Sequence, residues 1–432
     1  MEKRPHVLAV ACPAQAHVRS FLQFCNKIAT EGIKVTFVNT EFVHSKIITA
    51  MTEKEKEEFD DDGVILASIP DGLQDLNDRI DPLKIMESLK RVMPGHLMDL
   101  IITINNQSNE PITAVIADAT VGWILDVAER IGVQQFGFWS SGPASLTFFQ
   151  TLNLGHGDEA KGMNIIGDQE KMQKALLDIA ITSMQTVNRV KFMLGNVFYE
   201  LDSLNCDLIP KFLPVGPFLT TSQEEEKSPF GKSGNFYPED TSCLNWLNNK
   251  KPGSVIYVAF GTTSIVHQNQ VEEIAFALEL SKRSFLWACG ASFIFPRGFL
   301  DRVAERGKIV EWTPQQKVLG HRAIACFLTH CGWNSALESV SLGVPLLCWP
   351  YFADHFQVQN HICNEWKVGL RLDPDENGIR SREEILQKIE MLLSDDNIKA
   401  NALKLKDLAQ KSISKGGSSY ENIQKFINDL KN

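Results

Sequence analysis

A stretch in the second half of the chain, residues 312–355, combines residue types that suit an anionic ligand. A strand-like run at Cys326–Thr329 leads there into a short turn and then into a helical pattern. Gly332 lets a ligand approach the backbone closely, and we expect Asn334 or Ser335 to cap the helix. Because the amide groups and the dipole of a helix N-terminus attract negative charge, this turn predicts an anion site.

Three nearby side chains could bind the rest of such a ligand. His330 could donate to a phosphate oxygen, and Trp312 offers a flat face on which a base could stack. Glu338, one turn into the helix, could accept hydrogen bonds from a ribose diol. Taken singly, each has an ordinary structural reading, because tryptophans commonly pack in cores and a lone glutamate commonly lies on a solvated helix face. The grouping within one stretch favours a nucleotide ligand.

Strands and helices alternate in both halves of the chain, which predicts parallel sheets with helices on both faces. Ligands of such sheets lie at the carboxyl ends of the strands. The predicted strands are Val7–Ala11, Val35–Val38, Val115–Ala117, Gln135–Trp139, Val255–Phe260, Phe285–Ala288, Ile309–Glu311, Cys326–Thr329 and Pro345–Trp349. The predicted helices follow Pro13 as far as Gly32 and cover Trp123–Arg130, Val271–Leu280, Ser335–Ser341 and much of Ser381–Leu430.

A polar segment rich in Gly, Ser and Pro, residues 220–242, interrupts this alternation and is interpreted as an interdomain linker. It predicts an N-terminal domain at 1–219 and a C-terminal domain at 243–410. Residues 411–432 are expected to form a helix that packs back on the N-terminal domain. The fold class is therefore α/β, with two doubly wound, Rossmann-like domains facing a central cleft.

Composition narrows the functional classes. The net charge of -10 and the pI of about 5.6 argue against a nucleic-acid partner. Nine scattered cysteines without a CxxC pair favour a reducing compartment, and no apolar run is long enough to span a membrane. We therefore expect a cytoplasmic protein without integral membrane association.

Other catalytic signatures are missing from the sequence. It contains no G-x-S-x-G, Walker loop or G-x-G-x-x-G motif. The triplet Asp60–Asp62 follows a highly charged run, Glu53–Phe59, so we interpret it as solvated chain rather than a metal site. The ten histidines do not cluster at ligand spacing with Cys or carboxylates, and we expect no metal.

Residues 312–355 closely resemble the signature box of the plant secondary-product UDP-glycosyltransferases, without a gap, and the resemblance extends from Pro5 to the C-terminal helix. It implies the two-domain fold called GT-B, an inverting and metal-independent mechanism, a UDP-sugar co-substrate and no cofactor. By this resemblance Trp312 would stack on uracil, Gln315 would help hold the uridine and Glu338 would bind the ribose. The resemblance further assigns His330, Asn334 and Ser335 to the diphosphate, and Trp333, Asp354 and His355 to the sugar.

Two positions bear on the sugar. Family members that use a sugar acid tend to have Arg where Trp333 stands, so Trp favours a neutral sugar. Most glucose-using members end the box with Gln, whereas His355 resembles some galactose- or arabinose-using members. We expect transfer of a hexose, with glucose first, and the alternative is the same reaction with UDP-galactose or UDP-arabinose as donor.

The segment Pro13–Val18 resembles the part of the family that carries the catalytic histidine, although Ala16 stands where the family usually has Gly. His17 would be the general base, since an unperturbed imidazole titrates near neutral pH. Asp118 matches the second catalytic residue and would hold the imidazole in the right tautomer. Ser140 matches a position that contacts the sugar and a phosphate, and Thr262 and Thr263 match a loop that contacts the diphosphate.

Two functional hypotheses follow. The first is transfer of a hexose to a hydroxyl of a small hydrophobic acceptor, phenolic or terpenoid, by a monomeric enzyme. Its acceptor pocket is expected near Ile80–Met93, Thr120–Trp123 and Trp139–Phe149. The second is a UDP-sugar-binding protein without transfer activity, motivated by Ala16 and His355. Retention of both His17 and Asp118 favours the enzyme, while the sequence leaves the acceptor's identity open.

Overall fold

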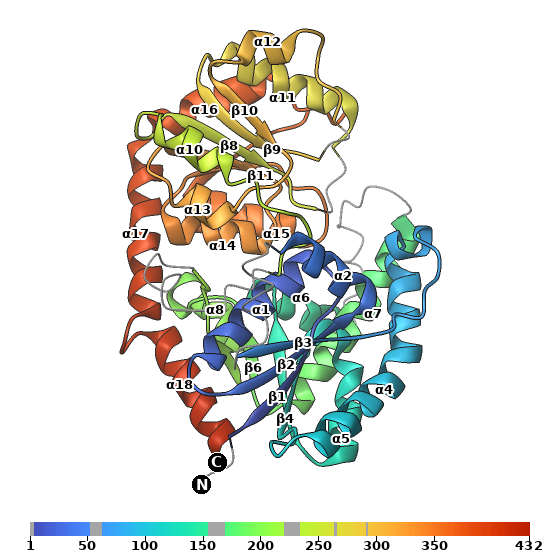
Figure 1. The fold of residues 1–432 in the computed structure, drawn as a ribbon. Coiled ribbons are helices and arrows are strands. Elements are labelled where there is room, and N and C mark those ends of the chain that lie inside the picture. The colour runs from blue at the N-terminus through green and yellow to red at the C-terminus, as the bar shows by residue number, and fades with distance from the viewer. Residues whose placement is uncertain (1–3, 52–62, 154–168, 220–233, 263–265, 291–292) are drawn as a thin grey trace. The chain divides into compact units, whose positions relative to one another are not determined.

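The computed structural model describes residues 4–51, 63–153, 169–219, 234–262, 266–290 and 293–432 (Figure 1). The chain divides into two compact units, one formed by Met1–Pro238 with Lys411–Asn432 and the other by Glu239–Gln410. The division at Pro238 falls inside the segment 220–242 that the sequence suggests as a linker. Residues 220–233 of that segment, and the triplet Asp60–Asp62, lie outside the described residues.

The described part of the first unit contains a seven-stranded sheet in which every neighbouring pair of strands is parallel. Most residues of its strands are buried, as expected of a parallel sheet that is covered on both faces. In spatial order they are β3 (Val64–Ile69), β2 (Lys34–Thr40), β1 (His6–Val10), β4 (Ala114–Asp118), β5 (Gln134–Trp139), β6 (Met193–Gly195) and β7 (Phe212–Pro214).

Aromatic rings from several elements fill the core on one face of this sheet. Phe21 and Phe24 of α1 (Gln15–Ala29) stack on Phe138 of β5, with centroid distances of 4.4 and 5.7 Å. Phe426 of α18 (Ser418–Lys431) contacts Phe24 at 5.7 Å and Phe136 at 4.9 Å. Residues 411–432 thus complete the core of the first unit rather than that of the second.

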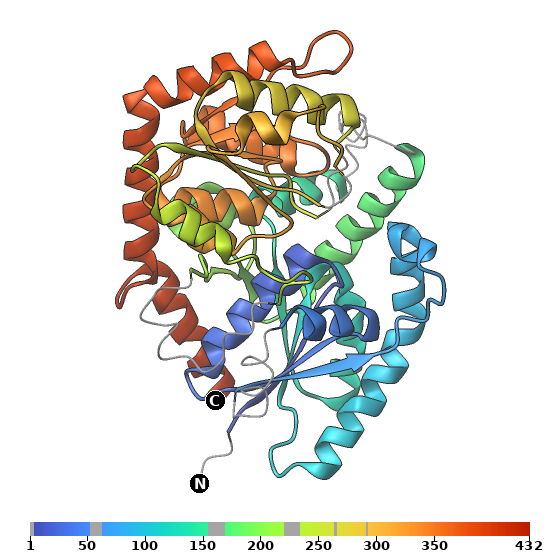
Figure 2. The same ribbon diagram turned by 45° about the horizontal axis from the view of Figure 1, so that its top comes forward.

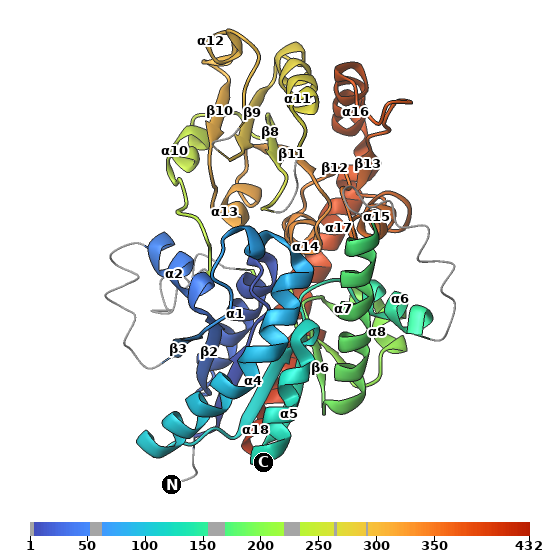
Figure 3. The same ribbon diagram turned by 90° about the vertical axis from the view of Figure 1, so that its right-hand side faces the viewer.

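Helices α4 (Pro82–Gln107), α5 (Leu125–Ile131) and α7 (Gln169–Arg189) lie together on one side of the first unit, as Figure 3 shows. Gly132 in the left-handed conformation ends α5, as its place in the sequence suggests. The remaining elements of the unit are α2 (Glu41–Ala50), η2 (Asn77–Ile80), α4 (Pro82–Gln107), η3 (Ala119–Ile124), α5 (Leu125–Ile131), α6 (Pro143–Asn153), α7 (Gln169–Arg189), η5 (Tyr199–Leu201) and α8 (Ser203–Leu208).

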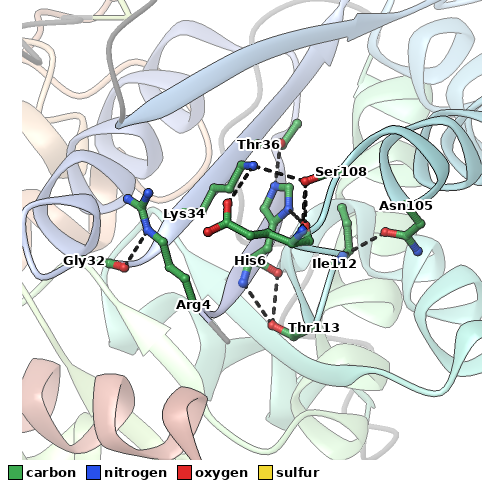
Figure 4. A network of polar contacts seen from close by, with 10 residues as sticks. Arg4, His6, Gly32, Lys34, Thr36, Asn105, Ser108, Ile112 and Thr113 are labelled. Atoms are coloured by element: carbon green, nitrogen blue, oxygen red, sulfur yellow. Dashed lines mark hydrogen bonds and ion pairs between the residues drawn. The ribbon is translucent and has the colours of Figure 1, made fainter. Parts of the chain in front are cut away.

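A buried histidine lies at the amino end of β1 (Figure 4). Nδ1 of His6 lies 2.8 Å from the carbonyl of Glu110, and Nε2 lies 2.9 Å from Oγ1 of Thr36. Since a carbonyl can only accept, Nδ1 carries the proton and Thr36 donates to Nε2. Burial lowers the pKa of His6, and the charge of Lys34 lowers it further. His6 is therefore neutral at physiological pH.

The described part of the second unit contains a six-stranded parallel sheet. Trp287 is fully buried in its core and contacts Phe295 at 5.3 Å. Helices α11 and α16 pack against each other (Figure 2). The spatial order of the strands is β10 (Gly307–Val310), β9 (Ser284–Ala288), β8 (Val255–Ala259), β11 (Ile324–Thr329), β12 (Leu346–Cys348) and β13 (Gly369–Arg371). The helices are α10 (Ser242–Asn248), α11 (Gln268–Leu280), α12 (Phe299–Val303), α13 (Gln315–Leu319), α14 (Trp333–Leu342), α15 (His355–Asn360), η6 (His361–Glu365), α16 (Arg382–Ser394) and α17 (Asp396–Ile413).

These two Rossmann-like units confirm the predicted α/β class. The predicted strands are all present within a residue or two of their bounds, whereas β3, β6, β7 and β13 were not predicted. The predicted helix Trp123–Arg130 is in fact two elements, η3 and α5. Among the described residues, no helix has both the length and the apolarity needed to cross a membrane.

Candidate active site

Both sheets share one topology, with strand order reversing beside their first strand. The reversal lies between β1 and β4 in the first unit and between β8 and β11 in the second. In doubly wound sheets, the loops at the carboxyl ends of these strands form the ligand site. His17 follows β1 and Asp118 ends β4, while Thr262 follows β8 and His330 follows β11. Each group of predicted residues thus lies at the switch point of its own sheet.

In the first unit, the structure brings His17 and Asp118 into direct contact. His17 is the third residue of α1, and its Nδ1 lies 2.7 Å from Oδ2 of Asp118. The Asp118 side chain is fully buried, whereas that of His17 retains 25% of its exposure. Since the carboxylate accepts the Nδ1 proton, the neutral ring carries its lone pair on Nε2. That tautomer is the one a general base needs.

Two hydroxyl groups complete this cluster. Oγ1 and the backbone amide of Thr120 donate to Oδ1 of Asp118, at 2.7 and 3.0 Å. The hydroxyl of Ser140 lies 2.9 Å from Nδ1 of His17. We predicted that Ser140 would be a ligand contact, and its contact with the histidine was not anticipated. The Thr120 contact was also missed, although Asp-x-Thr is a sequence pattern typical of a side chain that caps the following turn.

In the second unit, β11 leads through His330, Cys331 and Gly332 into α14. The expectation that Asn334 or Ser335 caps this helix was wrong. Gly332 is the N-cap, with φ -61° and ψ 138°, and it supplies no side-chain cap. The helix therefore begins earlier than expected, and Asn334 and Ser335 are its second and third residues.

Two glycines, Gly261 and Gly332, lie so close to the ring of His330 that neither position has room for a side chain. A Cβ added to Gly261, which follows β8 with φ +68°, would lie 2.8 Å from Nε2 of His330. A Cβ added to Gly332 would also collide with Nε2. Only glycine fits at these positions, so the loops after β8 and β11 close around one imidazole. Thr262 adjoins Gly261 and is exposed, while Thr263 lies outside the described residues.

His330 and His355 form a pair of buried imidazoles. Their ring centroids are 4.9 Å apart, at an interplanar angle of 81°. Burial lowers the pKa of His330 to about 3, with a further contribution from His355, and burial lowers the pKa of His355 to about 4. The amide of Phe352 lies 3.4 Å from Nδ1 of His355. Both rings are therefore neutral at pH 7 and can donate only from the nitrogen that carries the proton.

A second polar cluster joins α13 to α14. The amide nitrogen of Gln315 lies 2.7 Å from Oε2 of Glu338 and 3.0 Å from Oγ of Ser335. The amide nitrogen of Gln316 lies 2.9 Å from Oε1 of Glu338. Three predicted site residues thus meet here, together with Gln316, which the sequence analysis missed. Both oxygens of the buried Glu338 carboxylate are held by amide groups, which fixes its orientation.

The other predicted donor-site residues lie as follows. Trp312 follows β10 and is partly buried. Its backbone carbonyl accepts a hydrogen bond from the backbone amide of Asp240 at 3.0 Å. Trp333 is 3% exposed and packs against Trp366, with ring centroids 6.2 Å apart, so only a small edge can meet a ligand. Asp354 is the N-cap residue of α15 and is partly buried.

The described residues contain no group of three or more His, Cys, Asp or Glu side chains suited to a metal ion. The predicted donor-site residues that the structure describes in the second unit offer imidazole, hydroxyl and amide groups, together with the carboxylates of Glu338 and Asp354. The imidazole, hydroxyl and amide groups can donate to an anionic ligand, and the carboxylates can accept from hydroxyl groups.

Comparison with known proteins gives a consistent result. Residues 238–413 match the family described as UDP-glucoronosyl and UDP-glucosyl transferase. The chain is 35% identical to UDP-glycosyltransferase 83A1 of Arabidopsis thaliana, over 99% of this chain and 97% of that protein. It is 29% identical to 7-deoxyloganetin glucosyltransferase of Catharanthus roseus, over 99% and 97% of the two chains. The crystal structure of Os79 from O. sativa in complex with UDP superposes with a TM-score of 0.85 at 25% identity, covering 98% and 100%.

The chain belongs to the plant UDP-glycosyltransferase family. It is a UDP-sugar-dependent transferase, and its two Rossmann-like units make up the GT-B fold. The resemblance of residues 312–355 to the family's signature box is therefore confirmed.

Proposed function

We propose that this glycosyltransferase moves a hexose, with glucose as the expected sugar, from UDP to a hydroxyl of a small hydrophobic acceptor. In this mechanism Nε2 of His17 removes the acceptor proton while the oxygen attacks the anomeric carbon. One displacement of this kind inverts the configuration of that carbon. The observation that carries the proposal is the 2.7 Å contact between His17 and Asp118, because it fixes the basic tautomer and stabilises the imidazolium that forms.

The second unit would hold the donor by three kinds of contact. Trp312 would stack on the uracil, and the cluster of Gln315 and Glu338 would bind the uridine and its ribose hydroxyls. Glu338 is suited to this because its carboxylate is already oriented by two amides. Asp354, His355 and the exposed edge of Trp333 would contact the sugar.

The leaving UDP would be stabilised without a metal. The amino end of α14, with Asn334 and Ser335 in its first turn, presents backbone amides and the positive end of the helix dipole. The neutral His330 would add an N–H donor, and Thr262 and Thr263 a loop contact. Fixed donors of this kind favour the charge that develops on the leaving diphosphate. Ser140, which lies beside His17, would contact the sugar or a phosphate of the same donor.

Two observations bear on the identity of the sugar. A relative that is similar over 99% of this chain is named a glucosyltransferase, which supports glucose. His355 supports galactose or arabinose as the alternative, because histidine at this position resembles some family members that use those sugars. The acceptor is proposed to be a phenolic or terpenoid alcohol, bound near Ile80–Met93 and η3. Trp139, also expected there, is buried, and its indole N–H donates to the carbonyl of Gly142 at 2.8 Å.

We further propose that the protein works as a monomer in the cytoplasm and needs no cofactor. All nine cysteines are free thiols, which fits a reducing compartment. The alternative of a UDP-sugar-binding protein without transfer activity is not retained, because the chain belongs to a family of transferases.

One experiment tests the assignment of the general base, the identity of the donor sugar and the class of acceptor together. A screen of UDP-glucose, UDP-galactose and UDP-arabinose against phenolic and terpenoid alcohols, read by mass, compares the wild type with His17→Ala and His355→Gln. We expect His17→Ala to lose about 10²- to 10⁴-fold in turnover while still binding UDP, since general-base help is worth that much. His355→Gln should shift preference toward UDP-glucose relative to the other donors. Near-full turnover by His17→Ala with an unactivated alcohol would exclude the base assignment.

A further inference from the structure

We propose that Thr120 is a positioning residue for the reaction, acting through Asp118 to hold the catalytic imidazole. This inference rests on the proposed roles of His17 and Asp118. Thr120 was expected only as part of the wall of the acceptor pocket. Its contacts assign it a different task, because its hydroxyl points at the carboxylate that orients the base.

The geometry leaves Asp118 little freedom. Its side chain is fully buried, Oδ2 accepts from His17 at 2.7 Å, and Oδ1 accepts from Thr120 twice. With only the Thr120 amide on Oδ1, the carboxylate could still tilt about the line between that contact and the His17 contact on Oδ2. The hydroxyl contact at 2.7 Å adds a second point on Oδ1, which sets the plane of the carboxylate and therefore the direction of Oδ2.

The competing contact at Nδ1 makes this direction important. Ser140 Oγ lies 2.9 Å from the same nitrogen that donates to Asp118. One Nδ1 proton serves both acceptors, so a tilted carboxylate would give way to Ser140 and the ring would turn. By fixing the carboxylate, Thr120 favours the hydrogen bond from Nδ1 of His17 to Asp118 over the one to Ser140. Asp118 is the partner that stabilises the imidazolium.

The fold explains why Thr120 can do this. Asp118 is both the last residue of β4 and the N-cap of η3, so the chain turns within two residues and brings position 120 back over the carboxylate. Thr120 is 4% exposed, and its hydroxyl is directed to a charged acceptor in a buried setting. Hydrogen bonds to charged groups are among the stronger ones in proteins.

The test uses Thr120→Val, which keeps the shape of the side chain and removes only the hydroxyl. We expect kcat to fall about tenfold, as the loss of a hydrogen bond to a charged group predicts, with KM for both substrates nearly unchanged. Thr120→Ser should restore most of the loss. In an Asp118→Ala background Thr120→Val should have no further effect, because its action passes through the carboxylate.

Thr36→Val is the matched control. Thr36 of β2 is another buried threonine of the same unit whose hydroxyl bonds a side chain, here His6 at the amino end of β1, whereas His17 follows the carboxyl end of that strand (Figure 4). It should cost stability without changing kcat. UDP binding and thermal melting show whether each variant is folded.

A readout independent of turnover is the proton resonance of Nδ1–H of His17, identified as the downfield signal that His17→Ala lacks. It should shift in Thr120→Val and not in Thr36→Val. If Thr120→Val keeps wild-type kcat, raises only the acceptor KM, or is additive with Asp118→Ala, the inference is wrong. Should His17→Ala itself retain full activity, the proposed function fails instead.

Discussion

At the scale of single residues, the carboxylates of Asp118 and Glu338 are each held by partners that the sequence pattern did not all reveal. Asp118 is held by Thr120, two positions away, and Glu338 is held by amides from a different helix. The first partner was recognisable as a local capping pattern. The second required the tertiary packing of α13 on α14, which no short motif encodes.

Gln316 offers a test at this scale. Replacing it by Leu removes the amide that lies 2.9 Å from Oε1 of Glu338 and leaves that buried oxygen without this donor. We expect the affinity for UDP, measured by calorimetry, to fall about fivefold to tenfold, which corresponds to about 1 kcal/mol. Gln270→Leu is the control, because this buried glutamine of the same unit bonds the backbone of Arg380. Equal UDP affinities in the two variants would contradict the role of Gln316.

At the scale of elements, the sequence predicted the strands that carry the site and located their carboxyl ends to within a residue or two. Apolar runs ending at Asp118 and Thr329 were sufficient for that. The start of α14 was not predicted correctly, because Asn334 and Ser335 are good capping residues but Gly332 already adopts the capping conformation. The capping preference of Asn334 and Ser335 is overridden because the helix already begins after Gly332, where only glycine fits against His330.

A substitution at Gly261 tests whether the loops after β8 and β11, which contact His330 through Gly261 and Gly332, position its imidazole. Gly261→Ala introduces a Cβ 2.8 Å from the imidazole at φ +68°, whereas Gly253→Ala has φ +60° and nothing within 4 Å. Both variants should lose stability on the order of 1 kcal/mol from the strained backbone. Only Gly261→Ala should weaken UDP binding, since only it displaces the ring. Parallel melting curves and UDP titrations of the two variants separate these effects.

At the scale of the whole molecule, buried neutral histidines make stability depend on pH. Burial lowers the pKa of His6, and it lowers the pKa values of His355 and His330 to about 4 and about 3. The unfolded chain binds protons at these positions below about pH 6.5, and the folded chain does not. Their contribution is therefore fully present above pH 6.5 and is lost as the pH falls toward 4 and 3.

For His330 and His355 the expected slope approaches about 1.4 kcal/mol per pH unit each, and His6 adds to the slope in the same direction. Urea unfolding between pH 7.5 and 4.5 measures it. His6→Gln should make the curve shallower, whereas His96→Gln, at an exposed position, should leave it unchanged. A curve for His6→Gln that parallels the wild type would contradict the assignment of a buried neutral imidazole.

The path of the chain through its two units has a consequence for biosynthesis. Glu239–Gln410 is one continuous piece, whereas the first unit needs both Met1–Pro238 and Lys411–Asn432. On the ribosome the second unit has its complete sequence before the first, which waits for Phe426 to emerge and fill its aromatic core. N-terminal domains generally fold first during synthesis, whereas in this chain the second unit can complete its fold before the first. A chain truncated after Gln410 should therefore contain a finished second unit and an unfinished first one.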